Sequence, residues 1–479
     1  MSRSPQERRE RDSEEEGEEE AVASVTQAVG LGRGTGGPTS SRPRLSAEAV
    51  WPEHFVEAVA AQVAIDAARN GGRLAAAPAI VTVFQVLSSP ATYLHRDIQQ
   101  VCATWRAVSR SELLWKDLAG RIWSRPRSSL PSWRDEFVRL HRTAANFRVR
   151  RSAYSRLLPP SAVLSCRRLT LSDRHLAAGF RDGSVRLFDL PAGRPVATYR
   201  ADPHRDRLGR FSQAVSGVVL LVEPDERLAF ASQDGDIHVV SLDVSGTVRR
   251  AHAGNLVEDG TLVDFTGDDR RWVGLFTGVP GRSWHIWDAA TEQLVYVGGT
   301  LTDPDAVLGW HMLTDLSGPV VGRVRVAEPG VAVGCTTSSM EVVDLDDTAT
   351  TLNRLDLQHG SAVDSVDACE GRVMVVNSRG LAKVHDVLTL QEICRFRTPR
   401  RAEQEQQQQR AVGVEGCMNW GYALVCAARR FRVWDATTGE YLYSFRETIG
   451  EPAAVAASDR YVGAWADDTG LHLWDFGAL

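Results

Sequence analysis

The stretch of this chain that comes nearest to a known chemical site is GRGTGG at residues 32–37, which matches the G-x-G-x-x-G spacing of a dinucleotide-binding loop. Such a loop lies between a strand and a helix, but here no strand pattern precedes it and Pro-Thr-Ser-Ser follows. The sequence also lacks G-x-x-x-x-G-K-[ST], H-E-x-x-H and G-x-S-x-G, the usual marks of phosphotransferases and hydrolases. We therefore expect a protein that is not an enzyme and that uses no cofactor and no metal.

The cysteines and charges indicate where such a protein works. The seven cysteines, at positions 102, 166, 335, 369, 394, 417 and 426, are scattered and never form a C-x-x-C pair, which favours a reducing compartment. Nine Asp or Glu among the first 20 residues fit neither a signal peptide nor a transit peptide. No run of about 18 apolar residues predicts a membrane span.

The elements that must position any site begin after a tail. With 479 residues the chain has room for two or three folded units. Residues 1–45 combine an acidic run at 14–20 with Gly, Ser, Pro and Arg, and so contain too little apolar surface to offset the entropy of folding. We predict a disordered acidic and Gly-rich tail.

Helical periodicity occupies residues 46–150. Residues 46–72 predict one amphipathic helix, ended by Asn70-Gly71-Gly72, and residues 131–150 predict another, capped by Ser132. Between them, residues 78–123 predict three short helices with apolar stripes. The stripes are Ile80, Val83, Phe84 and Leu87 after Pro78; Ile98, Val101, Trp105 and Val108; and Leu114, Trp115, Leu118 and Ile122.

From about residue 151 the period changes to two, and a short strand motif recurs. Its seven copies are VRLFDL, IHVVSL, WHIWDA, MEVVDL, AKVHDV, FRVWDA and LHLWDF, with Asp at 189, 288, 344, 386, 435 and 475 and Ser at 241 in the second copy. Their spacings of 52, 47, 56, 42, 49 and 40 residues are near the roughly 40 to 45 of a four-stranded propeller blade. We therefore predict a mainly β protein whose residues 151–479 form a seven-bladed propeller.

The last copy ends three residues before the end of the chain, so its blade lacks an outer strand. An open sheet edge is a liability in a soluble protein. The extended stretch at residues 147–155 precedes the first copy, and we expect it to pair with the last blade.

Residues 76–123 resemble an F-box, through Ala77-Pro78, the stripe that ends at Leu87, VCATWR at 101–106 and LLWKDL at 113–118. The resemblance implies that this region docks a Skp-type adaptor held by a cullin scaffold. Burial of a few apolar anchors would supply the binding energy, at about 1.5 to 3 kcal/mol for each fully buried side chain. The implied adaptor-binding residues are Pro78, Ile80, Val83, Phe84, Leu87, Val101, Cys102, Trp105, Leu114, Trp115 and Leu118. The alternative is that these side chains form the core of a small helical bundle.

The later region resembles WD-repeat propellers, with Trp-Asp pairs at 287–288, 434–435 and 474–475. By this resemblance the six repeat aspartates are structural, since each ties a tight turn through hydrogen bonds to backbone amides. Arginines in the turns between second and third strands would bind phosphate or carboxylate groups of a substrate. They are Arg181, Arg282, Arg379, Arg429 and Arg430, and the alternative is that they are simply solvated.

An F-box followed by a WD-like propeller resembles the substrate receptors of cullin-type (SCF) ubiquitin ligases. The Glu-rich start, Ala-rich first helix and divergent blades are most similar to a family of plant transcriptional regulators of flower and organ development. The resemblance implies a nuclear receptor, or one also in the cytoplasm, whose propeller binds a transcriptional repressor or its adaptor for ubiquitination. The alternative is a transcriptional scaffold that recruits co-regulators without ubiquitin transfer.

Thirteen Lys or Arg against five Asp or Glu between residues 96 and 151 make this segment basic. Arg148, Arg150 and Arg151 fit a nuclear import signal, a phosphate-binding patch, or arginines that lie along a helix and an edge strand. Because no recognition helix or metal finger accompanies them, we do not expect sequence-specific binding of nucleic acid.

Overall fold

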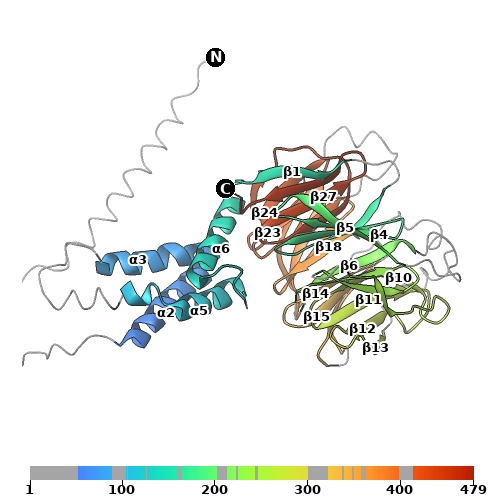
Figure 1. The fold of residues 1–479 in the computed structure, drawn as a ribbon, viewed down its shortest axis with the longest axis horizontal. Helices are drawn as coiled ribbons and strands as arrows, with labels where there is room; N and C mark the ends of the chain where they lie inside the picture. The colour runs from blue at the N-terminus through green and yellow to red at the C-terminus, as the bar shows by residue number, and fades with distance from the viewer. Residues whose placement is uncertain are drawn as a thin grey trace, which may run out of the picture.

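A computed structural model describes residues 52–88, 104, 106–125, 127–159, 164–201, 213–222, 225–242, 246–299, 322–336, 339–347, 350–357, 363–398 and 414–478. In this structure a group of helices packs against one side of a ring of β-sheets (Figure 1). The predicted tail at 1–45, a Gln-rich stretch at 404–409 and the beginning of the second helix of the F-box-like region lie outside the described residues, whereas Val108 near the end of that helix is buried in the structure. None of the described helices combines the length and the apolar character of a membrane span.

The helices form a small bundle, which we call the helical head. Its elements are α2 (Glu53–Gly71), the short helix η2 (Arg73–Ala75), α3 (Ala76–Ser88), α5 (Glu112–Trp123) and α6 (Trp133–Arg148). Pro78 lies in the first turn of α3, where the missing amide hydrogen removes no helical hydrogen bond. Ser111 and Ser132 cap α5 and α6, because each side chain accepts a hydrogen bond from the amide three residues on.

The core of the helical head joins all of its α-helices. Val56, Ile80, Leu118 and Phe137 are buried in it, and the Trp115 ring lies 5.2 Å from that of Phe137. Each helix therefore turns its apolar stripe towards the other helices.

The described part of the chain after α6 forms six sheets around a ring, five of four strands and one of eight. The four-stranded sheets are β2–β5 (Cys166–Leu171, His175–Phe180, Ser184–Asp189, Arg194–Arg200), β14–β17 (Arg323–Ala327, Val331–Cys335, Ser339–Asp344, Thr351–Asp356), β18–β21 (Val363–Cys369, Arg372–Asn377, Leu381–Asp386, Glu392–Arg397), β22–β25 (Glu415–Met418, Tyr422–Ala427, Arg430–Asp435, Tyr441–Ser444), and β1 (Ala153–Leu158) with β26–β28 (Pro452–Ala457, Tyr461–Ala466, Gly470–Asp475).

The eight-stranded sheet consists of β6–β9 (Val215–Leu221, Arg227–Ser232, Ile237–Ser241, Arg249–His252) and β10–β13 (Thr261–Gly267, Arg271–Thr277, Trp284–Asp288, Leu294–Gly298). One parallel pair, Phe265 with Gly217, joins the two halves. The close approach requires glycine, since a Cβ at position 217 would lie 2.0 Å from the carbonyl oxygen of Phe265.

The seven copies of the repeated motif all lie on third strands: β4, β8, β12, β16, β20, β24 and β28. The first strands contact one another in the order β2, β6, β10, β14, β18, β22, β26, and β26 contacts β2 again. The mainly β, propeller-like arrangement that the sequence predicts is thus confirmed, although the count of separate sheets differs from seven because two groups of strands are joined.

The expected completion of the last sheet is confirmed for Ala153, Tyr154 and Ser155, which pair with Asp475, Trp474 and Leu473 of β28. The predicted segment began too early, because Phe147 and Arg148 are the last residues of α6. The chain therefore passes from a helix of the helical head directly into the strand that completes the last sheet.

Candidate protein-interaction surfaces

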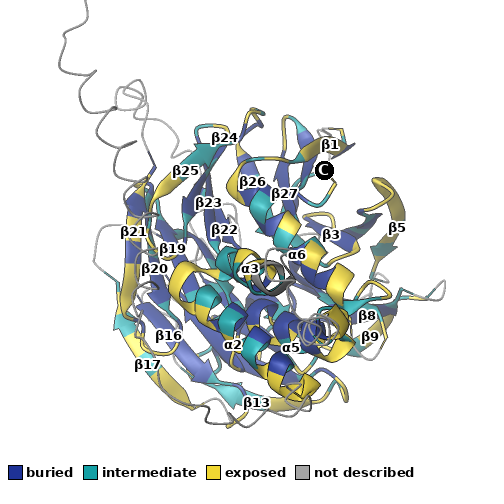
Figure 2. Ribbon diagram, turned by 90° about the vertical axis from the view of Figure 1, so that its left-hand side faces the viewer, coloured by how far each residue is buried: buried dark blue, intermediate teal, exposed yellow. Residues whose placement is uncertain are grey.

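The helical head covers one end of the ring. Seen from that side, α2, α3, α5 and α6 lie in front of the sheets (Figure 2). The contacts fall on turns between first and second strands: Arg73 forms an ion pair with Glu370, and Arg125 Nη1 lies 2.8 Å from Asp173 Oδ2. Arg125 also lies 3.8 Å from Asp459, whose pKa is raised to about 6 by burial despite the opposing charge of Arg125. Where the helical head packs, this face is therefore not available to another protein.

Aromatic contacts strengthen the same interface. The guanidinium of Arg73 lies 5.0 Å from the ring centre of Trp420 and 5.7 Å from that of Trp123, within range of a cation–π interaction. The two tryptophan rings are themselves 5.4 Å apart, edge to face. Trp420 comes from the turn between β22 and β23.

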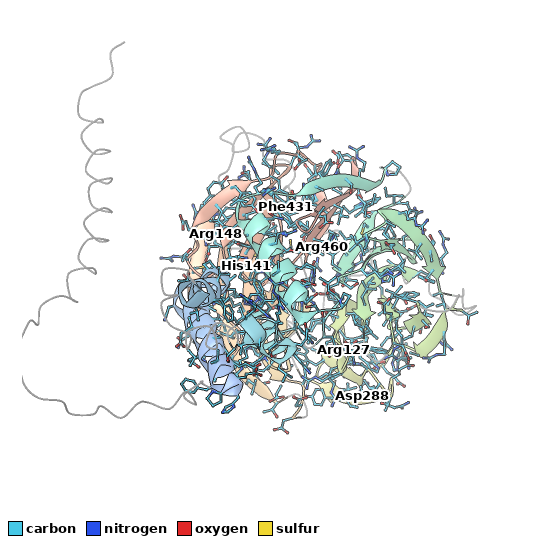
Figure 3. All side chains as sticks on the ribbon, turned by 60° about the vertical axis from the view of Figure 1, so that its left-hand side comes forward. Arg127, His141, Arg148, Asp288, Phe431 and Arg460 are labelled. Carbon is cyan, nitrogen blue, oxygen red and sulfur yellow. The ribbon has the colours of Figure 1, made fainter. Side chains whose placement is uncertain are left out.

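The end of α6 is inserted into the ring. The Phe147 ring stacks on Tyr422 at 4.7 Å and on Phe476 at 4.0 Å, and Asn146 donates a hydrogen bond of 2.9 Å to the carbonyl of Phe476. His141 and Arg148, labelled in Figure 3, mark successive turns of this helix. One part of α6 is buried in the core of the helical head, and its last residues are buried against the ring. The helix therefore holds the helical head in a fixed position against the ring.

The opposite end of the ring has the turns between second and third strands, where the five arginines singled out from the sequence lie. Arg282 is paired with Asp259 at 2.6 Å and Arg429 with Asp468 at 3.0 Å. Arg430 donates to Thr448 at 3.3 Å, while Arg181 and Arg379 are exposed. The structure thus brings the five to one face, which we call the open face, and pairs Arg282 and Arg429 with carboxylates of the chain itself.

One of these turns has an unusual backbone. Ala428 and Arg429 connect β23 to β24 with φ angles of 51° and 66°. A two-residue hairpin turn of this hand normally uses Asn-Gly, because residues with a Cβ are strained there by about 1 to 2 kcal/mol each. The strain is stored where Arg429 is displayed on the open face.

Charged side chains of the first strands line the centre of the ring. Asp264 of β10 is fully buried; it accepts hydrogen bonds from Arg168 Nε at 2.8 Å, Arg325 Nη1 at 2.9 Å and the Val324 amide at 3.0 Å. Burial alone would raise the pKa of Asp264, but the charges of the arginines outweigh it and lower the pKa. Arg325 also binds Asp367 at 3.1 Å.

Nearer the open face, the charged side chains at the centre of the ring are mostly basic. Arg167 and Arg323 lie at the first-strand ends beside the turns that follow second strands. Burial and neighbouring arginines, including Arg181, lower the pKa of Arg167 to about 9, and burial with Arg168 lowers that of Arg323 to about 10, so both remain cationic at neutral pH. Burial raises the pKa of Glu415 to about 7, although Arg323 opposes it. An anionic group entering here would relieve the repulsion among the arginines.

None of these central residues is among those singled out from the sequence. Their signal is a charge that interrupts an apolar first strand, as in CRRLTL, TLVDFTG and RVRVA. The pairing of Arg168 with Asp264 joins residues 96 positions apart, which no local pattern reveals.

The six repeat aspartates all accept hydrogen bonds from backbone amides two or three residues further along. Asp288 Oδ1, for example, accepts from Ala290 and Thr291, and Asp435 Oδ1 accepts from Thr437 and Thr438, at 2.9 to 3.2 Å. The bond from the Thr291 amide lowers the pKa of Asp288. Equivalent bonds are made by Asp189, Asp344, Asp386 and Asp475. Five of these carboxylates fix the turns between third and fourth strands, and Asp475 fixes the segment that follows β28.

The residues predicted to bind an adaptor are only partly accessible. Ile80, Leu114, Trp115 and Leu118 are buried in the core of the helical head, which corrects the expectation that they form an open docking stripe. Their helical spacing suits a core as well as an interface, and here they pack against α2 and α6. Pro78 is exposed, Val83 and Phe84 are half-buried, and the side chain of Leu87 with Val101, Cys102 and Trp105 lies outside the described residues.

Comparisons with known proteins were made on the sequence and on the fold. No family model matches the chain. It is 48% identical over 461 residues to the transcriptional regulator STERILE APETALA of Arabidopsis thaliana, covering 93% of this chain and 97% of that protein. A structure of U3-55K is similar in fold, with a TM-score of 0.50, 11% identity, and coverage of 67% of this chain and 98% of that one. A crystal structure of RRP9 WD40 repeats gives a TM-score of 0.49 at 11% identity, with 66% and 99% coverage.

Proposed function

Since the chain belongs to the family of STERILE APETALA, a transcriptional regulator, we propose that it too regulates transcription, by binding other proteins rather than by catalysis. The observation that carries the proposal is the basic mouth of the ring on the open face, where Arg323 and Arg181 lie near enough to the buried Arg167 to lower its pKa. The helical head covers part of the opposite face. The partners that suit a basic mouth are acidic or phosphorylated segments of nuclear co-regulators.

This proposal includes a propeller of seven blades of the WD type. Three observations support it: the motif recurs seven times on third strands, one parallel pair joins β6–β9 to β10–β13, and the first strands contact one another in a closed circle of seven. In this view the eight-stranded sheet is two blades that touch where Gly217 permits.

The test is identification of nuclear partners by proximity labelling. The full chain would be compared with an Arg181→Glu, Arg379→Glu variant and with a control, Arg194→Glu, whose exposed side chain lies on the outer strand β5. We expect the double variant to lose its co-regulators at least tenfold while the control retains them. An unchanged set of partners in the double variant would contradict binding at the open face.

A second function, substrate receptor of a cullin-type ubiquitin ligase, is favoured by the exposed apolar side chains of the helical head. Leu113, at the start of α5 within the F-box-like motif, is 72% exposed, and Val81 on α3 is 46% exposed. In this proposal these outer side chains, with Pro78, contact a Skp-type adaptor, and α6 sets the distance between the adaptor and the propeller.

Leu113→Asp tests the receptor function because it changes an exposed residue, whereas Trp115→Asp would disrupt the core. Full chain, variant and the control Val196→Asp, on outer strand β5, would be purified from cells with the proteasome inhibited. Adaptor and cullin should accompany the full chain and the control but not Leu113→Asp. If neither accompanies the full chain, the receptor function is wrong and the scaffold function is retained.

A further inference from the structure

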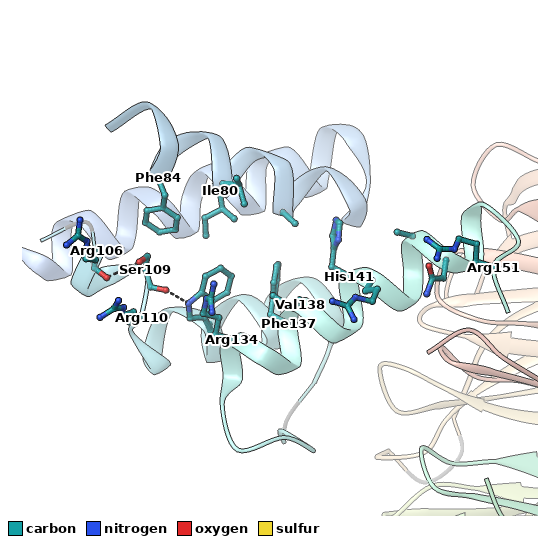
Figure 4. A pocket seen from close by; sticks show the side chains of 16 residues that line it. Ile80, Phe84, Arg106, Ser109, Arg110, Arg134, Phe137, Val138, His141 and Arg151 are labelled. Atoms are coloured by element: carbon teal, nitrogen blue, oxygen red, sulfur yellow. Dashed lines mark hydrogen bonds between the residues drawn. The ribbon is translucent and has the colours of Figure 1, made fainter. Parts of the chain in front are cut away.

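A groove of about 870 Å³ runs along the helical head between α3, α5 and α6 (Figure 4). Its floor is apolar, formed by Phe84 and Ala77 of α3 and by Val138 of α6, the last of these 42% exposed. Exposed apolar side chains gathered in one concave surface favour an occupant with apolar groups of its own.

The rim of the groove carries arginines that have no carboxylate partner among the described residues. Among the described residues that line it there is no carboxylate, but there are five exposed arginines: Arg106, Arg110, Arg134, Arg142 and Arg151. None of the five forms an ion pair with another described residue. Other arginines of the same helices are paired, Arg121 with Asp117 and Arg139 with Glu136. Arginines without a carboxylate partner among the described residues are thus gathered along the groove.

The sequence contains a segment of matching chemistry. Residues 12–20 hold seven carboxylates and no basic residue, and no other nine-residue stretch of the chain is as acidic. Directly after them, Val22, Val25 and Val29 recur at i, i+3 and i+7, the spacing of an apolar stripe on one face of a helix. The acidic side chains of this segment thus complement the basic rim of the groove, and its apolar side chains complement the apolar floor.

We propose that the groove binds the chain's own N-terminal segment, residues 12–29. Residues 30–51 connect it to the start of α2, and a random-coil chain of 22 residues would span about 26 Å on average and about 75 Å at full extension, enough to reach the groove. A tether of this length gives an effective concentration in the mM range, so that a weak contact is sufficiently populated. The segment then competes with any protein that uses this groove, whatever the open face binds.

The experiment measures binding of a fluorescein-labelled peptide of residues 12–30 to three full-length proteins at low salt. They are the natural chain, a chain with the six glutamates of residues 14–20 changed to glutamine, and that chain with Arg134→Glu and Arg142→Glu added. We expect the peptide to bind the neutralised chain at least tenfold more tightly than the natural chain, whose groove is already occupied. The groove variant should lose at least tenfold of that affinity.

Controls separate the groove from general charge and from misfolding. Arg148→Glu with Arg194→Glu, both exposed and outside the groove, changes net charge equally and should leave peptide binding unchanged. Val138→Glu should weaken binding without changing any arginine. Equal affinity of the natural and neutralised chains would overturn the proposal, as would unchanged binding by the groove variant. Preferential binding of a 20-base-pair DNA duplex over the peptide at these arginines would also overturn it, and would assign the groove to nucleic acid.

Discussion

Replacing Asp264 with asparagine removes the carboxylate that Arg168 and Arg325 share at the centre of the ring. Asp264 is fully buried and its two oxygens accept three hydrogen bonds, so the change leaves two arginine side chains without this anion. Removing one partner of a buried ion pair lowers the free energy of unfolding by about 3 to 5 kcal/mol. Arg325 keeps Asp367 and remains partly exposed, so we expect the lower end of this range.

The assay is thermal unfolding followed by far-ultraviolet circular dichroism. At about 2 °C per kcal/mol for a large domain, a loss of about 3 kcal/mol lowers Tm by about 6 °C. The matched control is Asp356→Asn, because the Asp356 side chain is 86% exposed and lies 3.8 Å from Arg354, an ion pair worth less than about 1 kcal/mol. A decrease no larger than that of the control would refute the shared-carboxylate reasoning.

The same substitution makes a prediction about pH. The pKa of Asp264 is lowered in the folded protein, so its ionised form stabilises the fold above the unfolded pKa of about 3.9. That stabilisation is lost as the pH falls below this value towards the folded pKa. The difference in Tm between the natural chain and Asp264→Asn should therefore be constant from about pH 5 to 8 and should shrink below about pH 4.

Three further predictions concern other parts of the molecule. The pKa of Glu415 is raised to about 7 in the folded protein, above its unfolded value of about 4.3. Its ionisation therefore destabilises the fold progressively as the pH rises from about 4.3 through 7. Glu415→Gln should flatten this part of the curve of Tm against pH. Phe147→Ala empties the joint between α6 and the ring and should lower the free energy of unfolding by about 3 to 5 kcal/mol in urea titrations, whereas the exposed neighbour change Arg148→Ala should cost less than about 0.5 kcal/mol. Asp435→Ala removes two turn hydrogen bonds and should cost about 1 to 2 kcal/mol by the same titration, and a cost near zero would show that the turn holds without its aspartate.

The turn arginines show the limits of sequence reasoning about the site. Their common face follows from the repeat, because corresponding turns of successive blades lie at the same end of the ring. Their partners do not follow, since Arg282 meets Asp259 and Arg429 meets Asp468 from other turns. Sequence alone could name the open face but could not say which of its arginines are already neutralised.

The sequence by itself determined where the strands lie and how they repeat, since alternation of apolar residues and turn aspartates is a property of each short segment. It also predicted that a strand preceding the first copy pairs with the last one, as Ala153–Leu158 does with Gly470–Asp475. Only the tertiary structure decided whether an apolar helical stripe becomes core or surface: Trp115 and Leu118 are buried because α6 and α2 pack over them, while Leu113 remains exposed. The reason is physical, because burial depends on which distant elements meet, as Arg73 meets Glu370 across 297 positions, and periodicity within one element carries no information about its neighbours.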